Sequence, residues 1–292
     1  MKVLIVGANG QLGQELQITA GPNIEAIALG RDQLDIANQQ QVDQVLADLK
    51  PQLVINAAAY TAVDKAEQES ELAYQINRDG VANLAAACQK IQARLIQLST
   101  DFVFDGCQST AYKPADVVNP LGCYGESKYA GEQAIQTSGL NDYLIVRTAW
   151  VYSSFGANFV KTMLRLMAEK DSLGVVADQL GTPSYARELA RAIWKMAQQP
   201  ELRGILHWTD AGVASWYDFA VAIQEEALEI GLLTTAIPIS PISTDAYPTP
   251  AKRPTFSVLD KTETWNVLQY PAVHWRIQLR KMLKVLVSEG AV

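Results

Sequence analysis

The sequence has little of the chemistry on which hydrolases and zinc proteins most often depend. It contains only three cysteines, Cys88, Cys107 and Cys123, without CxxC spacing, and only two histidines, His207 and His274. This set is too sparse for a zinc site or a disulfide framework, so each cysteine is interpreted as a small buried or loop residue. Neither a GxSxG nor a Walker A sequence occurs. Their absence argues against a serine hydrolase or a nucleotide kinase.

Charge and hydropathy exclude further classes. The chain has 24 basic and 31 acidic residues, a formal net charge of −7, and no run of lysine or arginine. Neither a nucleic acid nor an anionic membrane surface is therefore expected as the main partner. No apolar run approaches the roughly 18 residues of a membrane span. Because Met1 leads directly into the strand-like segment KVLIV instead of a basic and apolar leader, we expect a cytoplasmic protein that binds a small molecule.

The chain divides into two parts by its pattern. Over residues 1–150, helix-length segments alternate with short β-branched runs, namely KVLIV, IEAIAL, LVINAA, RLIQLS and YLIVRTA. This alternation predicts an α/β fold, a Rossmann-type doubly wound parallel sheet with helices on both faces. Over residues 151–292 the alternation stops, and loop signals separate helical segments. We expect a cofactor-binding domain over the first part and a smaller, mixed, mostly helical substrate region over the second, with some segments returning to the sheet.

A glycine-rich turn, VGANGQLGQEL, links the first predicted strand to the first predicted helix. In this context Gly7, Gly10 and Gly13 predict dinucleotide binding. Gly7 allows the sharp turn, Gly10 lets the backbone approach a pyrophosphate, and Gly13 lets the helix pack closely on the strand. A merely structural turn is the alternative.

The choice of cofactor depends on the end of the second strand, IALGRDQLDI. An NAD-preferring site usually carries an acidic residue here, but this chain has Gly30 followed by Arg31, whose cation could neutralise a 2′-phosphate. The pattern favours NADPH, although Asp32 next to Arg31 leaves NADH open. Asp35 could contact the adenine separately.

Three residues predict the chemistry. Tyr124 and Lys128 lie four apart at the start of a predicted helix, and Thr100 ends the fourth predicted strand, where parallel sheets bind ligands. A tyrosine ordinarily has a pKa of about 10, and we expect the ammonium of Lys128 to lower it. The set predicts hydride transfer from NAD(P)H to a carbonyl group. Tyr124 would protonate the developing alkoxide, Lys128 would hold the nicotinamide ribose, and Thr100 would bond the carbonyl oxygen.

These residues resemble the extended short-chain dehydrogenase/reductase superfamily, in which a GxxGxxG turn, a Ser/Thr strand end and YxxxK recur. Within it, the chain is similar over nearly all of its 292 residues to the dTDP-4-dehydrorhamnose reductase family. The blocks that carry this resemblance are GANGQLGQEL, NAAAYTAVDKAE, STDFVFDG, YGESKYAGE, RTAWVY, NFVKTML, DQLGTPS, WYDFA and AYPTPAKRP. The resemblance implies NADPH-dependent reduction of the 4-keto group of dTDP-4-dehydro-β-L-rhamnose to dTDP-L-rhamnose.

The resemblance also implies roles for individual residues. Besides the glycines, it implies cofactor contacts for Gln11, Leu12, Asp35, Ile36, Ala58, Ala59 and Tyr60. It implies contacts with the nucleotide sugar for Val63, Lys65, Thr100, Asp101 and Trp150. Lys252 and Arg253 lie on a proline-rich loop, where two cations could clamp the diphosphate. A solvated loop is the alternative for this last pair.

Metal binding, assembly and two other functions stay open. Some members of the family dimerise around a magnesium ion that glutamates bind. Glu15 and Glu188 match two of the three positions, but Val285 stands at the third, which leaves both Mg²⁺ and a homodimer open. The other functions are a regulatory binding subunit similar to the beta subunit of eukaryotic methionine adenosyltransferase, and a reductase or epimerase of another nucleotide sugar.

Overall fold

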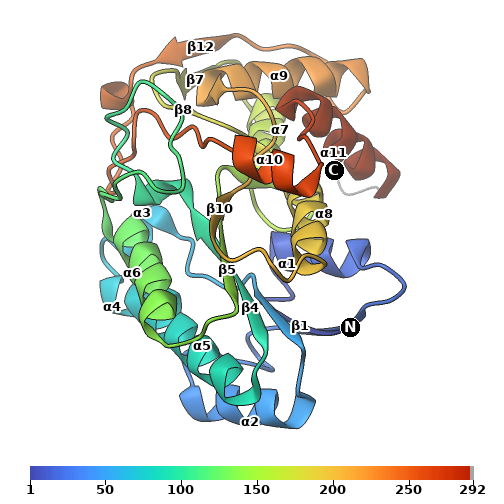
Figure 1. Cartoon of the computed structure of the whole chain (residues 1–292). Coiled ribbons are helices and arrows are strands. Elements are labelled where there is room, and N and C mark those ends of the chain that lie inside the picture. Colours follow the sequence, from blue (N-terminus) through green and yellow to red (C-terminus); the bar gives the residue numbers. More distant parts are fainter. Residues whose placement is uncertain (290–292) are drawn as a thin grey trace.

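A six-stranded parallel sheet forms the centre of the molecule in the computed structural model, which describes residues 1–289 (Figure 1). Its strands, in spatial order, are β10 (Gly204–His207), β5 (Tyr143–Thr148), β4 (Arg94–Thr100), β3 (Leu53–Asn56), β1 (Lys2–Val6) and β2 (Glu25–Leu29). The chain builds β2 on one side of β1 and then crosses to build the other strands on the opposite side. This reversal is where open α/β sheets bind their ligands. The predicted Rossmann-type fold is confirmed.

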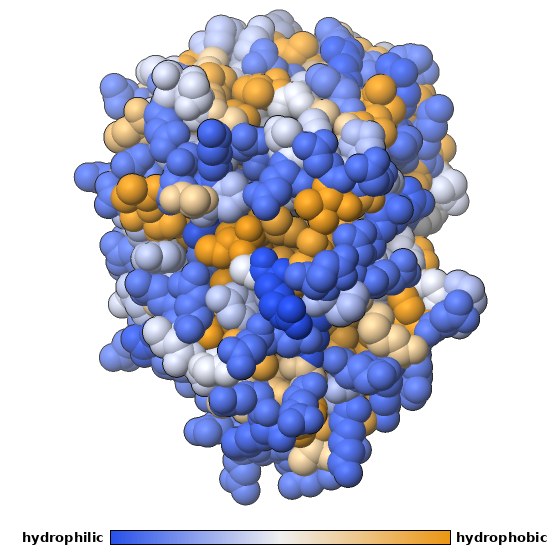
Figure 2. Space-filling model, in the orientation of Figure 1, coloured by the Kyte–Doolittle hydropathy of each residue, from blue (hydrophilic) through white to orange (hydrophobic). Residues whose placement is uncertain are grey.

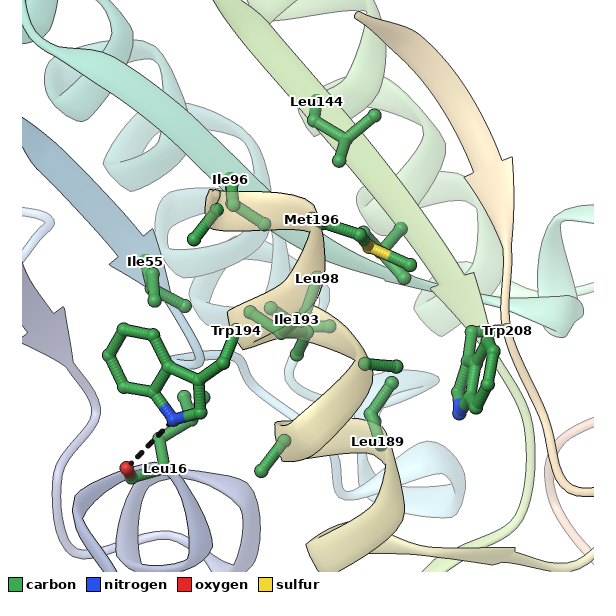
Figure 3. Packing of buried hydrophobic residues seen from close by; sticks show 14 of the residues in the cluster. Leu16, Ile55, Ile96, Leu98, Leu144, Leu189, Ile193, Trp194, Met196 and Trp208 are labelled. Atoms are coloured by element: carbon green, nitrogen blue, oxygen red, sulfur yellow. Dashed lines mark hydrogen bonds between the residues drawn. The ribbon is translucent and has the colours of Figure 1, made fainter. Parts of the chain in front are cut away.

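Both faces of the sheet are covered, which explains why its strands are almost wholly apolar. Along β1, Val3 and Ile5 pack into one buried cluster while Leu4 and Val6 pack into another, because side chains alternate along a strand. The first face is covered by α1 (Gln11–Thr19), α8 (Ala186–Ala197) and α10 (Thr262–Leu268). The second face is covered by α2 (Gln39–Leu49), α5 (Gly80–Ile91) and α6 (Cys123–Thr137). Figure 3 shows the first cluster, in which Trp194 of α8 donates a hydrogen bond of 3.1 Å from Nε1 to the carbonyl of Leu16.

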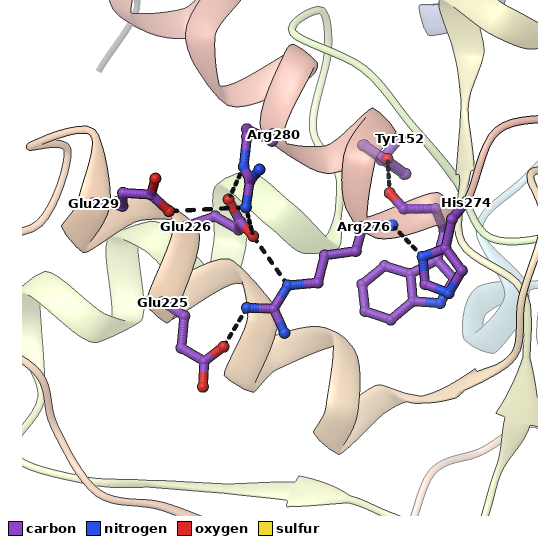
Figure 4. A network of polar contacts seen from close by, with 8 residues as sticks. Tyr152, Glu225, Glu226, Glu229, His274, Arg276 and Arg280 are labelled. Carbon is purple, nitrogen blue, oxygen red and sulfur yellow. Dashed lines mark hydrogen bonds and ion pairs between the residues drawn. The ribbon is translucent and has the colours of Figure 1, made fainter.

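The second half of the chain supplies another buried cluster, centred on three helices. These are α7 (Phe159–Glu169), α9 (Trp216–Glu229) and α11 (Trp275–Glu289). Short strands join them, namely β6 (Val151–Tyr152), β7 (Leu173–Val176), β8 (Leu180–Gly181), β9 (Ser184–Tyr185), β11 (Ala214–Ser215) and β12 (Ile239–Ile242). The buried Glu226 of α9 accepts hydrogen bonds from Arg276 and Arg280 of α11 and so ties these two helices together (Figure 4).

Short helices complete the chain between these layers. They are α3 (Val63–Ala66), α4 (Ser70–Tyr74), the π-helix η1 (Gln75–Asp79) and the 3₁₀ helices η2 (Asp101–Val103) and η3 (Thr244–Ala246). Figure 2 shows a largely hydrophilic face whose hydrophobic side chains gather in a band across the middle. Among the helices in residues 1–289, none is long and apolar enough to cross a membrane.

The chain crosses between the two halves more than once. After β6, α7 and β7 to β9, it returns to the sheet as α8, which packs on the first face, and as β10, which pairs with β5. It then leaves again for β11 and α9. The sheet is therefore completed only by residues 186–207, well beyond residue 150.

Candidate active site

A cleft of about 530 Å³ lies at the carboxyl ends of the sheet strands and is closed on the other side by residues of α7 and α9. It brings together residues that the sequence places far apart. The cleft is lined by the predicted site residues Gly10, Gln11, Leu12, Ala59, Val63, Thr100, Asp101, Tyr124, Lys128, Trp150 and Arg253.

The glycine turn has the geometry that its sequence predicts. Gly7 has a φ of +82°, and a Cβ added there would lie 2.6 Å from the backbone nitrogen of Ala58. At Gly13 an added Cβ would lie 2.2 Å from the carbonyl oxygen of Gly7, so only glycine lets α1 approach the strand this closely. Within the described chain no side chain caps the N-terminus of α1, and its first turn has no acidic residue. The free N–H groups and the helix dipole at Gln11 therefore suit an anion.

Tyr124 and Thr100 both line the cleft, and the Thr100 side chain favours the ionised form of the Tyr124 phenol. Thr100 donates to Oδ1 of Asp101 over 3.1 Å, and its Oγ1 accepts from the backbone N–H of Phe102 over 3.2 Å. Burial raises the pKa of Tyr124 to about 12, with the Thr100 hydrogen bond opposing and Asp101 adding to the rise. Tyr124 is therefore a neutral phenol throughout the physiological pH range.

Lys128 lies one helical turn below Tyr124 and is buried. Its Nζ donates a hydrogen bond of 2.7 Å to the carbonyl of Leu98 on β4. Burial lowers the pKa of Lys128 to about 8, although the carboxylate of Glu132 opposes this. The expectation that Lys128 lowers the pKa of Tyr124 is wrong for this structure, because removing the phenol from water disfavours its charged form more strongly than any neighbour favours it.

Asp101 lies beside Thr100 at the start of η2 and is fully buried. Burial raises the pKa of its carboxyl to about 6, against the hydrogen bonds that favour the charged form. The carboxylate is thus ionised at neutral pH and becomes neutral in mild acid.

Arg253 is held at the rim of the cleft by Asp64 of α3. Its two terminal nitrogens donate to the two carboxylate oxygens of Asp64 over 3.0 and 2.8 Å. Asp64 also accepts from the backbone N–H of Ala251 over 3.2 Å, and Arg253 lowers the pKa of Asp64. This two-pronged geometry fixes the plane of the guanidinium group.

Several predicted residues lie outside the lining of the cleft. Arg31, Lys65 and Lys252 are exposed. Ile36 is buried in the second sheet cluster. Tyr60 donates from its hydroxyl to Glu69 over 2.7 Å.

Asp35 lines a different hollow, which is shallow and lies over the start of α2. Its Oδ1 accepts from the backbone N–H of Ala37 over 3.1 Å, which stabilises the local turn. The structure thus gives Asp35 a structural contact, and its role toward the adenine stays a prediction, as do those of Arg31 and Ile36.

Both glutamates suggested for a metal have internal partners. Glu15 is fully buried, pairs with Arg187 over 2.7 Å and accepts from the hydroxyl of Ser153 over 2.7 Å. Glu188 pairs with Arg191 and accepts from the hydroxyl of Tyr270 over 2.8 Å. Residues 1–289 bring together no group of three or more histidine, cysteine or carboxylate side chains that could hold a metal. Both carboxylates thus have protein partners, and binding of Mg²⁺ stays an open prediction.

Comparison with known proteins identifies the family. The family model described as "RmlD substrate binding domain" matches residues 1–288. A dTDP-4-dehydrorhamnose reductase of Aggregatibacter actinomycetemcomitans is 40% identical over 288 residues, which cover 96% of this chain and 98% of that one. The chain therefore belongs to the dTDP-4-dehydrorhamnose reductase family.

Two solved structures of this family agree with the fold in detail. The dTDP-4-dehydrorhamnose reductase of Clostridium acetobutylicum is 42% identical, covers 98% of this chain and 100% of its own, and has a TM-score of 0.92. That of Bacillus anthracis, solved in complex with NADP, is 37% identical over 97% of this chain and 99% of its own, with a TM-score of 0.91.

Sequence reasoning left four residues in or beside the cleft without a role: Asp64, Phe159, Gln179 and Trp216. Phe159 and Trp216 line the cleft, Asp64 orients Arg253, and Gln179 accepts from Nε1 of Trp216 over 3.2 Å. All four lie in blocks already marked by the resemblance to the family, namely TAVDKAE, NFVKTML, DQLGTPS and WYDFA. Those blocks were the available signal, but only the fold shows what the residues contact.

Proposed function

We propose that this member of the family reduces the 4-keto group of dTDP-4-dehydro-β-L-rhamnose to a hydroxyl with NADPH, giving dTDP-L-rhamnose. The observation that carries the proposal is the convergence of Thr100, Tyr124 and Lys128 in one cleft with the uncapped N-terminus of α1. The family membership and the NADP complex of the Bacillus anthracis relative support both the substrate class and the cofactor.

The residues of the cleft fit a dinucleotide. The free N–H groups at Gln11 and Leu12 suit its phosphates. At the position where NAD-preferring sites typically carry an acidic side chain, this chain has Gly30. Exposed Arg31 follows at once, and this combination supports NADPH over NADH. When bound, NADPH supplies the hydride that reduces the keto carbon.

The chain's own part in the reaction is to hold the carbonyl oxygen and to deliver a proton. With the ketone in the cleft, the protonated hydroxyl of Tyr124 is the donor to its oxygen. Thr100 gives its only proton to Asp101 in this structure, so it would donate to the ketone only after its hydroxyl turns from that carboxylate. As negative charge develops on the ketone oxygen, the Tyr124 proton moves to it and the O–H bond of the product forms. A phenol with a pKa of about 12 is fully protonated before this step.

Lys128 would hold the nicotinamide ribose beside Tyr124. Its bond to the Leu98 carbonyl fixes where its charge lies. Because the pKa of Lys128 is about 8, the ammonium form predominates at neutral pH but disappears in moderate alkali.

The upper part of the cleft suits the nucleotide sugar. Arg253 offers a fixed guanidinium group at the rim, which fits a diphosphate, and exposed Lys252 precedes it. Val63 and Trp150 add apolar surface to the lining of the same cleft.

The test follows NADPH absorbance with the keto-sugar nucleotide as substrate. We expect Tyr124→Phe to lower kcat by about 10²- to 10⁴-fold with little change in the Kd of NADPH, because only proton donation is lost. Tyr129→Phe is the matched control, since Tyr129 lies on the same helix but packs against Phe104 and Tyr112 instead of lining the cleft. Full activity of Tyr124→Phe, or greater activity on a different nucleotide sugar, would overturn the proposal.

A further inference from the structure

Two tryptophans from distant parts of the chain stack in the wall of the cleft. Trp150 follows β5, and Trp216 is the first residue of α9. Their ring centroids lie 3.6 Å apart with an angle of 6° between the planes, and both side chains line the cleft. This spacing leaves no room for a third ring between them. A ligand therefore meets the two indoles as one apolar surface, which Phe159 extends by packing against Trp216.

Trp150 is held in a costly backbone conformation. Its φ of +47° is in the left-handed region, which costs a residue with a side chain about 1–2 kcal/mol. Such conformations persist only where the surrounding structure enforces them, and they cluster at functional sites. The surrounding structure thus holds the Trp150 indole in place although the backbone conformation of this residue is unfavourable.

Gly181 of β8 provides the space that this placement requires. A Cβ added at Gly181 would lie 2.6, 2.7 and 2.8 Å from Cε2, Nε1 and Cζ2 of Trp150. The indole could not keep its position above any larger residue. Gly181 also pairs in the antiparallel β8–β11 ladder with Ala214, two residues before Trp216. One short ladder therefore fixes both the support of Trp150 and the ring that stacks on it.

Trp216 is fixed in turn by Gln179, two residues before Gly181. Nε1 of Trp216 donates to Oε1 of Gln179 over 3.2 Å, and Nε2 of Gln179 donates to Oγ1 of Thr244 over 3.0 Å. The indole N–H of Trp216 is thus already used and is not offered to a ligand. What Trp216 presents to the cleft is apolar.

We propose that the stacked indoles of Trp150 and Trp216, held in place by Gly181 and Gln179, form the surface that receives the C6 methyl group of the sugar and disfavours a hydroxyl at C6. This inference rests on the proposed function and assigns its sugar specificity. A 6-hydroxyl placed against Trp216 would lose water and gain no partner from that indole. Trp216 is then a substrate-contacting residue, and Gly181 is a positioning residue that acts through Trp150.

The test measures binding of dTDP-L-rhamnose and of its 6-hydroxy counterpart, dTDP-L-mannose, by calorimetry in the presence of NADP⁺. A hydrophobic pocket rejects an added hydroxyl by up to about 100-fold, so we expect the wild type to prefer dTDP-L-rhamnose by roughly 10- to 100-fold. Trp216→Leu and Gly181→Ala should each bring this ratio toward one, whereas Trp216→Phe should retain part of it. The Kd of NADPH should stay unchanged in all three variants.

Two controls separate a local effect from damage to the fold. Trp265→Phe removes an indole of α10 that lies outside the cleft lining, and it should leave the ratio unchanged. The exciton-coupled circular dichroism of the Trp150–Trp216 stack should disappear in Trp216→Leu and persist in Trp265→Phe. If Trp216→Leu does not fold, the binding preference of Trp216→Phe and Gly181→Ala for dTDP-L-rhamnose over dTDP-L-mannose tests the role of the indole surface instead.

The outcomes also separate this inference from the proposed function. A wild type that reduces the keto-sugar but binds both sugar nucleotides equally would refute the inference and leave the function standing. So would folded variants that keep the wild-type ratio. A wild type that neither reduces the keto-sugar nor binds dTDP-L-rhamnose would refute the function, and the inference with it.

Discussion

Replacing Gly13 by alanine should detach the cofactor turn from its support. The added Cβ would lie 2.2 Å from the carbonyl oxygen of Gly7 and 2.9 Å from the Cα and C atoms of Ala8, all of them backbone atoms that cannot rotate away. Ordinary contact distances are about 3.4 Å or more, so the start of α1 must retreat by roughly 1 Å. The N–H groups at Gln11 and Leu12 retreat with it.

This displacement has a calculable effect on cofactor binding. A hydrogen bond of about 2.9 Å that lengthens by about 1 Å is effectively lost. Each hydrogen bond to a charged group contributes about 1.5–3 kcal/mol, so losing one or two corresponds to about 3 kcal/mol, or roughly 100-fold in Kd. Stability should fall less, because an overpacking cost of about 1–3 kcal/mol is partly offset by the better helix propensity of alanine, about 1 kcal/mol.

The assay is calorimetric titration of NADPH into Gly13→Ala, with the melting temperature and circular dichroism of the same sample. Gly21→Ala is the matched control, because a Cβ at Gly21 would meet no described atom within 4 Å. The control should bind NADPH as the wild type does. If folded Gly13→Ala also binds NADPH within about threefold of the wild type, the argument from close packing of α1 is wrong.

Three further predictions concern charge. Because burial lowers the pKa of Lys128 to about 8, kcat/KM should fall as pH rises through about 8. Lys128→Met should abolish this alkaline decrease in kcat/KM. A wild-type kcat/KM that stays constant through this pH range would contradict the role given to Lys128. Asp64→Asn should raise KM for the nucleotide sugar about 3- to 10-fold, since Arg253 loses the partner that orients it. The kcat of the variant should stay within about twofold of the wild-type value. An unchanged KM would show that the Asp64–Arg253 pair is only structural. Glu226→Gln should lower the free energy of unfolding by about 1–3 kcal/mol. This loss is smaller than for a fully buried ion pair, because water screens the half-exposed Arg276 and Arg280. The pKa of Glu226 is lowered in the folded state, so its contribution is present above the unfolded pKa of about 4.5 and is lost as pH falls further. Urea unfolding at neutral pH and at about pH 3 should therefore show a gap between wild type and variant that narrows in acid, and a constant gap would refute the ion-pair explanation.

The centre of the sheet was predictable because β1, β3 and β5 are buried on both faces and are therefore mostly apolar. Runs such as YLIVRTA can hardly form anything else between helix-length segments. β10 could not be assigned in the same way, because Gly204–His207 contributes only four residues and its partner β5 lies some sixty positions earlier. Pairing at that distance is set by tertiary packing and leaves no local signal.

The reactive residues were also predictable, whereas their electrostatics were not. Thr100 could be placed near Tyr124 because parallel strands present their carboxyl ends at one edge of the sheet. The sequence shows that Lys128 lies one turn from Tyr124, but it does not show how deeply the phenol is buried. Burial determines the direction of the pKa shift here. Contacts such as the Trp150–Trp216 stack join residues 66 positions apart and depend wholly on the fold.

The late arrival of β10 and α8 bears on how the chain is made. During synthesis the first five sheet strands emerge from the ribosome with β5 as an open edge, and the apolar face beneath α8 is uncovered until residues 186–207 follow. Exposed edges and apolar faces of this kind invite association with other chains. We expect a fragment ending near residue 150 to keep this open edge and uncovered face, and therefore to associate with other chains instead of folding separately.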